Sequence, residues 1–214
     1  MGFKCGIVGL PNVGKSTLFN ALTNSSKAQA ENFPFCTIDP NIGVVLVPDN
    51  RLDKLSEISK SKKKINTTIS FVDIAGLVKG ASEGEGLGNQ FLSHIRETQA
   101  IIHVVRCFEN PDITHVHKNI DPINDLEVVE TELLLADLET VIKARIKLER
   151  VAKSGDKKGV NQFERLQDLE EQLSKGILGR ESSYAEKNDT YFKDLQLITM
   201  KPCLYVANVE ENSE

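Results

Sequence analysis

Residues Gly9 to Ser16 are of the types that bind a chain of phosphates. They read Gly-Leu-Pro-Asn-Val-Gly-Lys-Ser and match the P-loop pattern in full. Glycines let backbone N–H groups turn toward phosphate oxygens where a side chain would collide. Lys15 would bring positive charge to the β- and γ-phosphates, and Ser16 a hydroxyl ligand for Mg²⁺. The predicted phosphate-binding residues are Asn12, Val13, Gly14, Lys15, Ser16 and Thr17.

A second motif, Asp73-x-x-Gly76, ends an apolar run that begins at Ile69. Asp73 would hold the Mg²⁺ shell, and Gly76 would present its N–H to a γ-phosphate. Alone the motif is too short to be specific, but it follows a complete P-loop. Between the two motifs, Thr37 lies in an irregular loop and is the candidate hydroxyl that closes on Mg²⁺. The predicted metal ligands are therefore Ser16, Thr37 and Asp73.

The catalytic group is less obvious. Leu77 occupies the place where related P-loop hydrolases carry a water-orienting glutamine, and it cannot hydrogen-bond water. Histidines are the natural substitutes. His115 lies beyond the fourth predicted strand, at the end of the sheet where nucleotides bind. We predict His115 as the water-positioning residue, with His94 as the alternative and Lys15 stabilising phosphate charge. His103 lies inside a strand and is interpreted as structural.

The base-reading segment is Asn208-Val209-Glu210-Glu211. Guanine-specific P-loop proteins carry Asn-Lys-x-Asp here, with the Asp accepting two hydrogen bonds from guanine. Valine replaces the lysine and a longer glutamate replaces the aspartate. We expect Asn208, Val209 and Glu211 to contact the base, with a weakened preference for guanine.

Asn12 suggests a second cation. P-loop enzymes with asparagine at this position and no catalytic glutamine can use K⁺ beside the phosphates, with the asparagine as a ligand. K⁺ is therefore a further candidate cofactor, alongside Mg²⁺.

The elements that position these residues alternate between strand and helix. Apolar and β-branched runs predict strands at 3–8, 44–47, 68–72, 100–105 and 202–207. Helices are expected at 16–22 and around 52–58. Strands alternating with helices predict an α/β fold with a mostly parallel sheet, as in P-loop NTPase domains.

A different pattern lies between the fourth and fifth strands. From Asp125 to about Lys153 apolar residues recur at four-three spacing, interrupted only by Arg145, and a second amphipathic stretch carries Phe163 to Leu173. The pattern predicts an antiparallel helical hairpin, a coiled-coil arm whose first helix reaches about 40 Å. The alternative is two ordinary helices folded flat on the sheet. The predicted division is 1–124 with 199–214 for the nucleotide domain and 125–198 for the arm.

Composition narrows the functional classes. A net charge of −5 argues against bulk binding of nucleic acid, and no DNA partner is expected. The dense run at 60–64 is interpreted as a solvated loop, with a local RNA contact as the alternative. The four scattered cysteines show no zinc or redox spacing. No apolar stretch approaches the ~18 residues of a membrane span. We expect a soluble, cytoplasmic protein.

The residues of three runs, 4–17, 32–39 and 71–89, resemble the Obg-like ATPases of the YchF type. The glycine-rich stretch 80–88 is similar to the mobile second switch of Obg-related proteins, and 103–110 matches this family more closely than P-loop proteins at large. The resemblance runs through all 214 residues. It implies ATP as the nucleotide and the ribosome or its RNA as the partner. Members normally continue with a final strand and helix and a TGS domain, so the chain is expected to lack these.

The sequence is compatible with three functional hypotheses. The leading hypothesis is a slow ATP hydrolase that acts as a conformational switch, with the arm presenting the state to a partner. One alternative is a GTPase that tolerates the altered base motif. The other is a nucleotide-sensing binding module with incidental hydrolysis, which Leu77 favours. A P-loop kinase is disfavoured because no arginine-rich lid segment follows the motifs.

Overall fold

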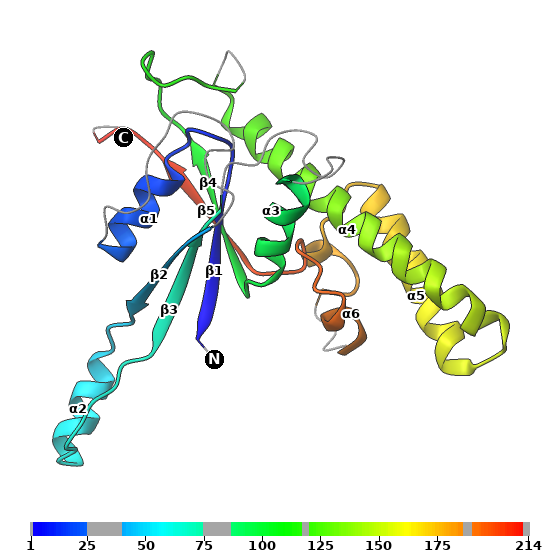
Figure 1. Cartoon of the computed structure of the whole chain (residues 1–214), viewed down its shortest axis with the longest axis horizontal. Helices are drawn as coiled ribbons and strands as arrows, with labels where there is room; N and C mark the ends of the chain where they lie inside the picture. The colour runs from blue at the N-terminus through cyan, green and yellow to red at the C-terminus, as the bar shows by residue number, and fades with distance from the viewer. Residues whose placement is uncertain (1, 25–39, 75–86, 117–119, 186–189, 212–214) are drawn as a thin grey trace.

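The computed structural model of the chain describes residues 2–24, 40–74, 87–116, 120–185 and 190–211. These residues form a β-sheet flanked by helices and a long helical arm (Figure 1). In chain order the elements are β1 Phe3–Val8, α1 Lys15–Thr23, β2 Asn41–Leu46, α2 Asn50–Ile58, β3 Thr68–Asp73, α3 Leu87–Arg96, β4 Ala100–Arg106, α4 Pro122–Lys153, α5 Lys157–Ser174, the 3₁₀ turn η1 Gly179–Glu181, α6 Thr190–Asp194 and β5 Cys203–Asn208. The five predicted strands and the helix after the P-loop are confirmed.

The described strands form one sheet in the order β2-β3-β1-β4-β5. β2 runs antiparallel to β3, and the other three pairings are parallel. The mostly parallel α/β fold is therefore confirmed. Because β1, β3, β4 and β5 run in one direction, their carboxyl ends lie at one edge of the sheet. The strand register places Asp73 and Asn208 at that edge, since Ile7 of β1 pairs with Asp73 and Arg106 of β4 pairs with Asn208.

The central strands are buried on both faces, which explains their continuous apolar runs. Ile7 and Val8 of β1 and Ile101 of β4 are nearly inaccessible to solvent. Phe19 of α1 and Ile95 of α3 pack into the same core. Figure 1 shows α1 and α3 on opposite sides of the strands. The core thus holds β1 and β4 rigidly, and the loops that follow these strands start from fixed points.

Helix α4 starts earlier than the predicted Asp125. It begins at Pro122, because proline fits the first helical turn, where its missing N–H has no partner to lose. The Asp121 side chain caps the helix by accepting from the Asn124 N–H at 3.1 Å. The early start places Asp125 in the first turn, where its carboxylate faces a favourable helix dipole.

Helix α4 belongs to two cores at once. Val129 and Leu133 pack with the sheet core, whereas Leu134 and Val141 pack with α5. The helix therefore runs without interruption from the nucleotide domain into the arm. The domain boundary predicted at residue 125 falls within its first turn.

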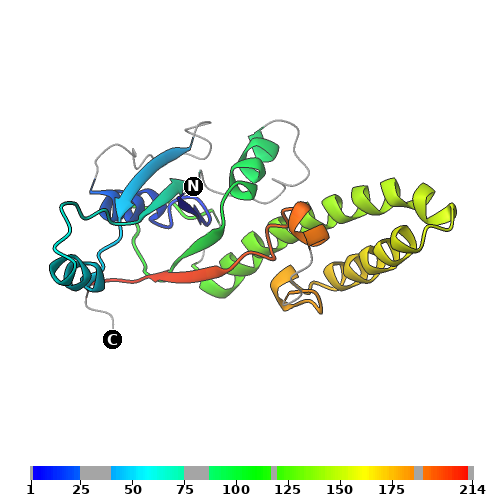
Figure 2. The same cartoon turned by 90° about the horizontal axis from the view of Figure 1, so that it is seen from below.

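The predicted antiparallel hairpin is confirmed. In Figures 1 and 2 α4 and α5 lie side by side and extend away from the sheet, which excludes two helices folded flat on it. Leu166, Leu169 and Leu173 of α5 are fully buried against α4. The interruption at Arg145 is explained by a cross-helix ion pair with Glu170.

The lysine run at 60–64 lies between α2 and β3, and all four of its lysines are exposed. This agrees with the predicted solvated loop. Among the described residues, no helix combines the length and apolar character needed to cross a membrane.

Candidate nucleotide-binding site

The P-loop runs from the carboxyl end of β1 into α1, and its backbone takes the left-handed turns that the motif requires. Gly14 has φ 98°, and a Cβ there would lie 2.4 Å from the side-chain nitrogen of Asn208. A Cβ on Gly9 would lie 2.4 Å from the carbonyl oxygen of Val104. Asn12 also adopts a positive φ of 62°, which asparagine tolerates better than most residues. Larger residues at these glycines would disrupt the loop.

Lys15 is buried within the P-loop. Its ammonium donates to the Leu10 carbonyl oxygen at 2.6 Å. Burial lowers the pKa of Lys15 to about 8, and the nearby Asp73 carboxylate partly offsets this effect. A desolvated ammonium at the start of α1 is suited to bind a polyanion, because phosphate oxygens would replace the water that it has lost. Thr17 follows in the same turn and is exposed.

Two of the three predicted metal ligands lie together. The Ser16 hydroxyl donates to Asp73 Oδ2 at 2.8 Å, which joins the first turn of α1 to the end of β3. Asp73 Oδ1 is buried and has no hydrogen-bond partner among the described residues. Burial raises the pKa of the Asp73 carboxyl, while the Ser16 hydrogen bond and the Lys15 charge oppose that shift. An unsatisfied buried carboxylate oxygen beside a hydroxyl fits a hard cation such as Mg²⁺. Thr37 and Gly76 lie outside the described residues.

The base-reading segment contacts the P-loop through its first residue. The Asn208 side chain donates to the Val13 carbonyl oxygen at 3.0 Å. The Asn208 carbonyl accepts from the Cys107 N–H at 2.8 Å, so the end of β5 is held to the loop after β4. Val209 is 53% exposed, and Glu211 is exposed as well. The structure thus brings Asn208 to the phosphate loop and leaves the two altered positions open to solvent.

Asn12 connects the P-loop to the loop that follows β4. Its side-chain nitrogen donates to the Thr114 carbonyl oxygen at 3.0 Å. The next residue, His115, directs its imidazole toward α4, with Nε2 2.8 Å from Asp125 Oδ2. Only 5% of the His115 side chain and 3% of the Asp125 side chain are exposed. The predicted catalytic histidine is therefore adjacent to a P-loop contact and paired with a buried carboxylate.

Two further histidines, His94 and His103, occupy different environments, and His117 lies outside the described residues. His94 is half-buried in the last turn of α3, and the described residues give it no hydrogen bond or ion pair. His103 is buried inside β4 with its ring 5.8 Å from that of Tyr205. Burial, with the charges of Arg180 and Lys15, lowers the pKa of His103 to about 4. A neutral buried ring agrees with the structural role predicted for it.

A polar junction ties the arm to the segment before β5. The buried Asp137 carboxylate of α4 accepts from the Ile198 N–H at 2.8 Å and from the Thr199 N–H at 2.6 Å. The Thr199 hydroxyl adds a third bond at 2.7 Å. Burial raises the pKa of the Asp137 carboxyl, although these hydrogen bonds oppose the shift.

The same junction holds the end of α3. The Lys201 ammonium donates to the carbonyl oxygens of Ile95, Arg96 and Thr98 at 2.6 to 2.7 Å. Arg96 in turn donates to Thr140 Oγ1 of α4 at 2.9 Å. Helix α3, helix α4 of the arm and the segment that leads into β5 are therefore joined by neighbouring hydrogen bonds.

Sequence reasoning missed Asp125, Asp137 and the Thr114 carbonyl. None belongs to a spaced motif. The Thr114 carbonyl and Asp137 contact residues more than 60 positions away in the chain, whereas Asp125 contacts His115, ten positions away. The one available signal is the pair Asp121 and Asp125 at the start of a long helix, which reads as ordinary capping.

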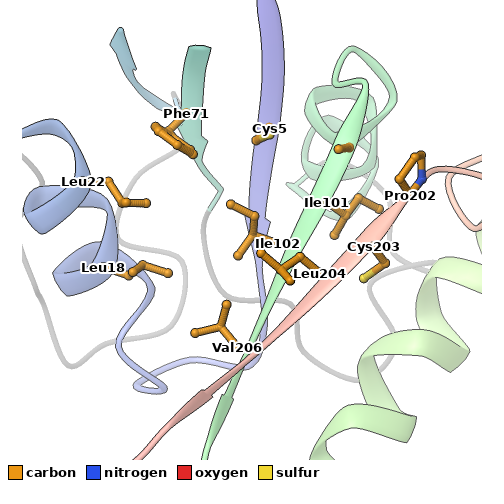
Figure 3. Close-up of a pocket in the computed structure, with 11 residues that line it drawn as sticks. Cys5, Leu18, Leu22, Phe71, Ile101, Ile102, Pro202, Cys203, Leu204 and Val206 are labelled. Atoms are coloured by element: carbon orange, nitrogen blue, oxygen red, sulfur yellow. The ribbon is translucent and has the colours of Figure 1, made fainter. Parts of the chain in front are cut away.

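An apolar cavity of about 460 Å³ lies between α1 and the sheet (Figure 3). Leu18 of α1 faces Phe71, Ile102 and Val206 of the strands across it. Its apolar lining offers no partner to a phosphate, so it is not the nucleotide site.

The model of the family described as 50S ribosome-binding GTPase matches residues 4–136. The chain is 55% identical to "Ribosome-binding ATPase YchF" of Escherichia coli O157:H7 and 53% identical to that of Bacillus subtilis (strain 168), in each case over 99% of this chain and 58% of the relative. A solved structure of the Schizosaccharomyces pombe YchF GTPase has a TM-score of 0.75 at 38% identity, covering 98% of this chain and 57% of that one. The chain thus spans less than two thirds of the length of these relatives.

Proposed function

Because this chain belongs to the 50S ribosome-binding GTPase family and its resemblance to YchF-type ATPases is confirmed, we propose that it hydrolyses ATP with Mg²⁺ as a conformational switch. The observation that carries the proposal is the joined site of Lys15, Ser16 and Asp73. Mg²⁺, when bound, would neutralise the charge that develops on the β- and γ-phosphates. Ser16 and Asp73 would hold it, with Thr37 completing the set.

The chain's own residues would bind and orient the nucleotide. The P-loop N–H groups and Lys15 would hold the phosphates, and Gly76 would sense the γ-phosphate. His115 would position the attacking water, with His94 as the second candidate. Asn12 would supply a ligand for K⁺, so turnover should fall when Na⁺ replaces K⁺. Equal rates in the two salts would remove the K⁺ proposal.

A preference for ATP over GTP is supported by the altered base reader. A lysine cannot lie over the base, because Val209 stands in its place. Glu211 is one methylene longer than the guanine-reading aspartate, and a carboxylate cannot satisfy the N1 acceptor of adenine. Selectivity for ATP would therefore come from backbone groups and pocket shape. The alternative proposal, a GTPase that tolerates this motif, depends on Glu211 still reading guanine.

Ribosome association is proposed from the names of the relatives, which are called ribosome-binding. The arm is the element suited to contact a large partner, and the polar junction of Asp137 and Lys201 would report the nucleotide state to it. The protein would then act in the cytoplasm. If hydrolysis stays negligible with a partner present, the nucleotide-sensing module becomes the better description.

The first experiment is competitive binding of ATP and GTP, with Mg²⁺ and K⁺, to this chain and to a Lys15→Ala variant. We expect ATP to bind more tightly and the variant to lose both nucleotides. Tighter binding of GTP would favour the GTPase. Binding of neither nucleotide to the parent chain would contradict the proposal for this chain.

A further inference from the structure

Strand β4 ends in a buried arginine that the proposed function does not use. Apart from His103 the strand is apolar until Arg106, whose side chain is inaccessible to solvent. None of the ion pairs among the described residues includes Arg106. Burying a charge without a counter-charge is costly. An arginine in this position is therefore expected to have a specific task.

The guanidinium of Arg106 holds three carbonyl oxygens of the loop that follows its own strand. Nε donates to the carbonyl of Phe108, Nη1 to that of Ile113 and Nη2 to that of Asn110, each at 3.1 Å. The guanidinium carbon also lies 4.6 Å from the centroid of the Phe108 ring. A guanidinium presents five N–H donors in a rigid fork, so one side chain can hold several carbonyls in fixed relative positions. The loop is thus folded around a cation.

The hydrogen bonds within the loop close a local turn. The Ile113 N–H donates to the Asn110 carbonyl at 3.3 Å, and the Asp112 N–H donates to Asn110 Oδ1 at 2.9 Å. These bonds do not reach the sheet. Arg106 makes that connection, because its own backbone is fixed in β4 beside Asn208. Since surface loops are mobile unless they are tied down, the guanidinium is the group that fixes this turn relative to the sheet.

The residues directly after Ile113 are those that the proposed function uses. The Thr114 carbonyl accepts from the Asn12 side chain at 3.0 Å, and the His115 ring lies 2.8 Å from a carboxylate of α4. In Figure 1 this loop lies beyond the carboxyl end of β4. The Ile113 carbonyl that Arg106 holds belongs to the same planar peptide unit as the Thr114 nitrogen. A shift of that carbonyl would therefore be passed on to Thr114 and His115.

We propose that Arg106 is a positioning residue for hydrolysis, which acts through the loop on His115. The proposal rests on the proposed function for the role of His115, whereas the placement of the loop rests on the contacts of Arg106. By fixing the Ile113 carbonyl, the guanidinium would keep His115 at the edge of the sheet where nucleotides bind. Loss of this positioning should change the rate more than the affinity, because other residues hold the phosphates.

Two substitutions separate the shape of the guanidinium from its charge. Arg106→Lys keeps the charge but replaces the planar fork by a single nitrogen. Arg106→Gln removes the charge and leaves no unpaired cation in the interior, so it serves as the second variant if the lysine variant does not fold. The matched control is Arg165→Lys in α5. The guanidinium carbon of Arg165 lies 4.8 Å from the centroid of the Phe192 ring, so this change also removes a stacked arginine, but in the arm.

The first measurement compares kcat and Kd for ATP in the parent, the three variants, His115→Gln and the double variant with Arg106→Lys. Urea unfolding identifies the variants that fold. We expect both Arg106 variants to lower kcat by at least about 10-fold and to weaken ATP binding by less than about 3-fold. In the His115→Gln background, Arg106→Lys should cause no further loss of kcat, because it acts through that ring. Arg165→Lys should keep the parental kcat.

The second measurement follows the loop without relying on hydrolysis. Diethyl pyrocarbonate modifies accessible imidazoles, and only 5% of the His115 side chain is exposed. We expect both Arg106 variants to accelerate modification of His115 by at least about 5-fold, because the loop opens more often. His94 on α3 is the internal control and should change by less than about 2-fold. Peptide mass spectrometry resolves the two histidines.

A further loss of kcat in the double variant would overturn the proposal, since Arg106 would then act independently of His115. Full activity in Arg106→Lys with loss in Arg106→Gln would do the same, because charge alone would then suffice. An unchanged rate of His115 modification would also contradict it. A parent chain that hydrolyses no ATP would contradict the proposed function instead. The modification rates would then decide by themselves whether Arg106 positions the loop.

Discussion

His115 Nε2 lies 2.8 Å from Asp125 Oδ2, and both side chains are almost completely buried. Among the described residues, Asp125 Oδ1 has no hydrogen-bond partner, and the contact of this carboxylate with another side chain is the one with His115. A carboxylate behind an imidazole fixes the orientation and tautomer of the ring. If His115 orients the attacking water, Asp125 would act as its positioning residue.

This pairing predicts that Asp125→Asn lowers the kcat for ATP by about 10-fold while leaving the Kd for ATP nearly unchanged. His115→Gln should lower kcat at least as much. The double variant should be no slower than His115→Gln alone, because Asp125 acts through the ring. Steady-state rates and nucleotide binding on the three variants check this. A normal or raised kcat in Asp125→Asn would contradict it.

Asn208 is expected to act on the phosphate loop rather than on the base. Its amide donates to the Val13 carbonyl at 3.0 Å. We predict that Asn208→Ala weakens ATP and GTP by a similar factor, about 10-fold, because the loss of one hydrogen bond loosens the loop for both. Competition binding measures the ratio of the two affinities. A change in that ratio would assign Asn208 to base recognition.

In contrast to Asn208, the altered positions Val209 and Glu211 are expected to change the ratio of the ATP and GTP affinities. Val209→Lys with Glu211→Asp restores the side chains of a guanine reader and should raise the affinity for GTP relative to ATP by about 10-fold. The matched control is Glu210→Asp, which leaves both altered positions unchanged. An unaltered ratio in the double variant would show that these positions do not reach the base.

Because His103 is buried with a lowered pKa, the folded protein is expected to lose stability in acid. Its folded-state pKa of about 4 lies below the usual value of 6.5. Between these values the unfolded chain binds a proton that the folded chain does not, so stability falls as pH decreases from 6.5 toward 4. Between pH 7 and pH 5 this amounts to about 2 kcal/mol of the free energy of unfolding.

Urea unfolding at pH 7 and pH 5 measures this loss, and His103→Gln provides the comparison. The variant should lose about 2 kcal/mol less between the two pH values than the parent, because glutamine does not titrate. Parallel losses in the two proteins would show that other groups govern the acid response.

The Asp137 carboxylate is the acceptor that joins α4 to the segment before β5. Asp137 accepts three hydrogen bonds in a buried position. We predict that Asp137→Ala lowers the free energy of unfolding by about 3 kcal/mol, because buried donors lose their acceptor. The same change at the exposed Asp194 should cost less than about 0.5 kcal/mol. Hydrogen exchange at the Ile198 and Thr199 amides should accelerate in the first variant only.

The sequence predicted those parts of the fold and site whose signal is local. The strands could be recognised from short apolar runs, and the phosphate loop from eight consecutive residues. The predicted start of helix α4, Asp125, lies three residues after the observed start at Pro122. The apolar face shared by α4 and α5 was predicted correctly. The presence of Arg145 on that face is explained only by its ion pair with Glu170, which the sequence does not reveal.

The rest of the site arises from tertiary contacts between single polar residues. Asn12 and Thr114 are 102 positions apart, and Asp137 and Thr199 are 62 apart. No spacing rule connects such pairs. His115 and Asp125 are only ten apart, yet they are brought together by the loop and the first turn of α4, whose start had been misplaced.

The continuity of α4 has a mechanical consequence. After Pro122 the helix contains neither glycine nor proline through Lys153, so no residue in it acts as a hinge. The segment beyond Asp137 is about 24 Å long, and a rotation of about 10° at the root would swing its free end by about 4 Å. A tilt of the nucleotide domain would thus be carried to the far end of the arm as a displacement, with the Asp137 hydrogen bonds at the pivot.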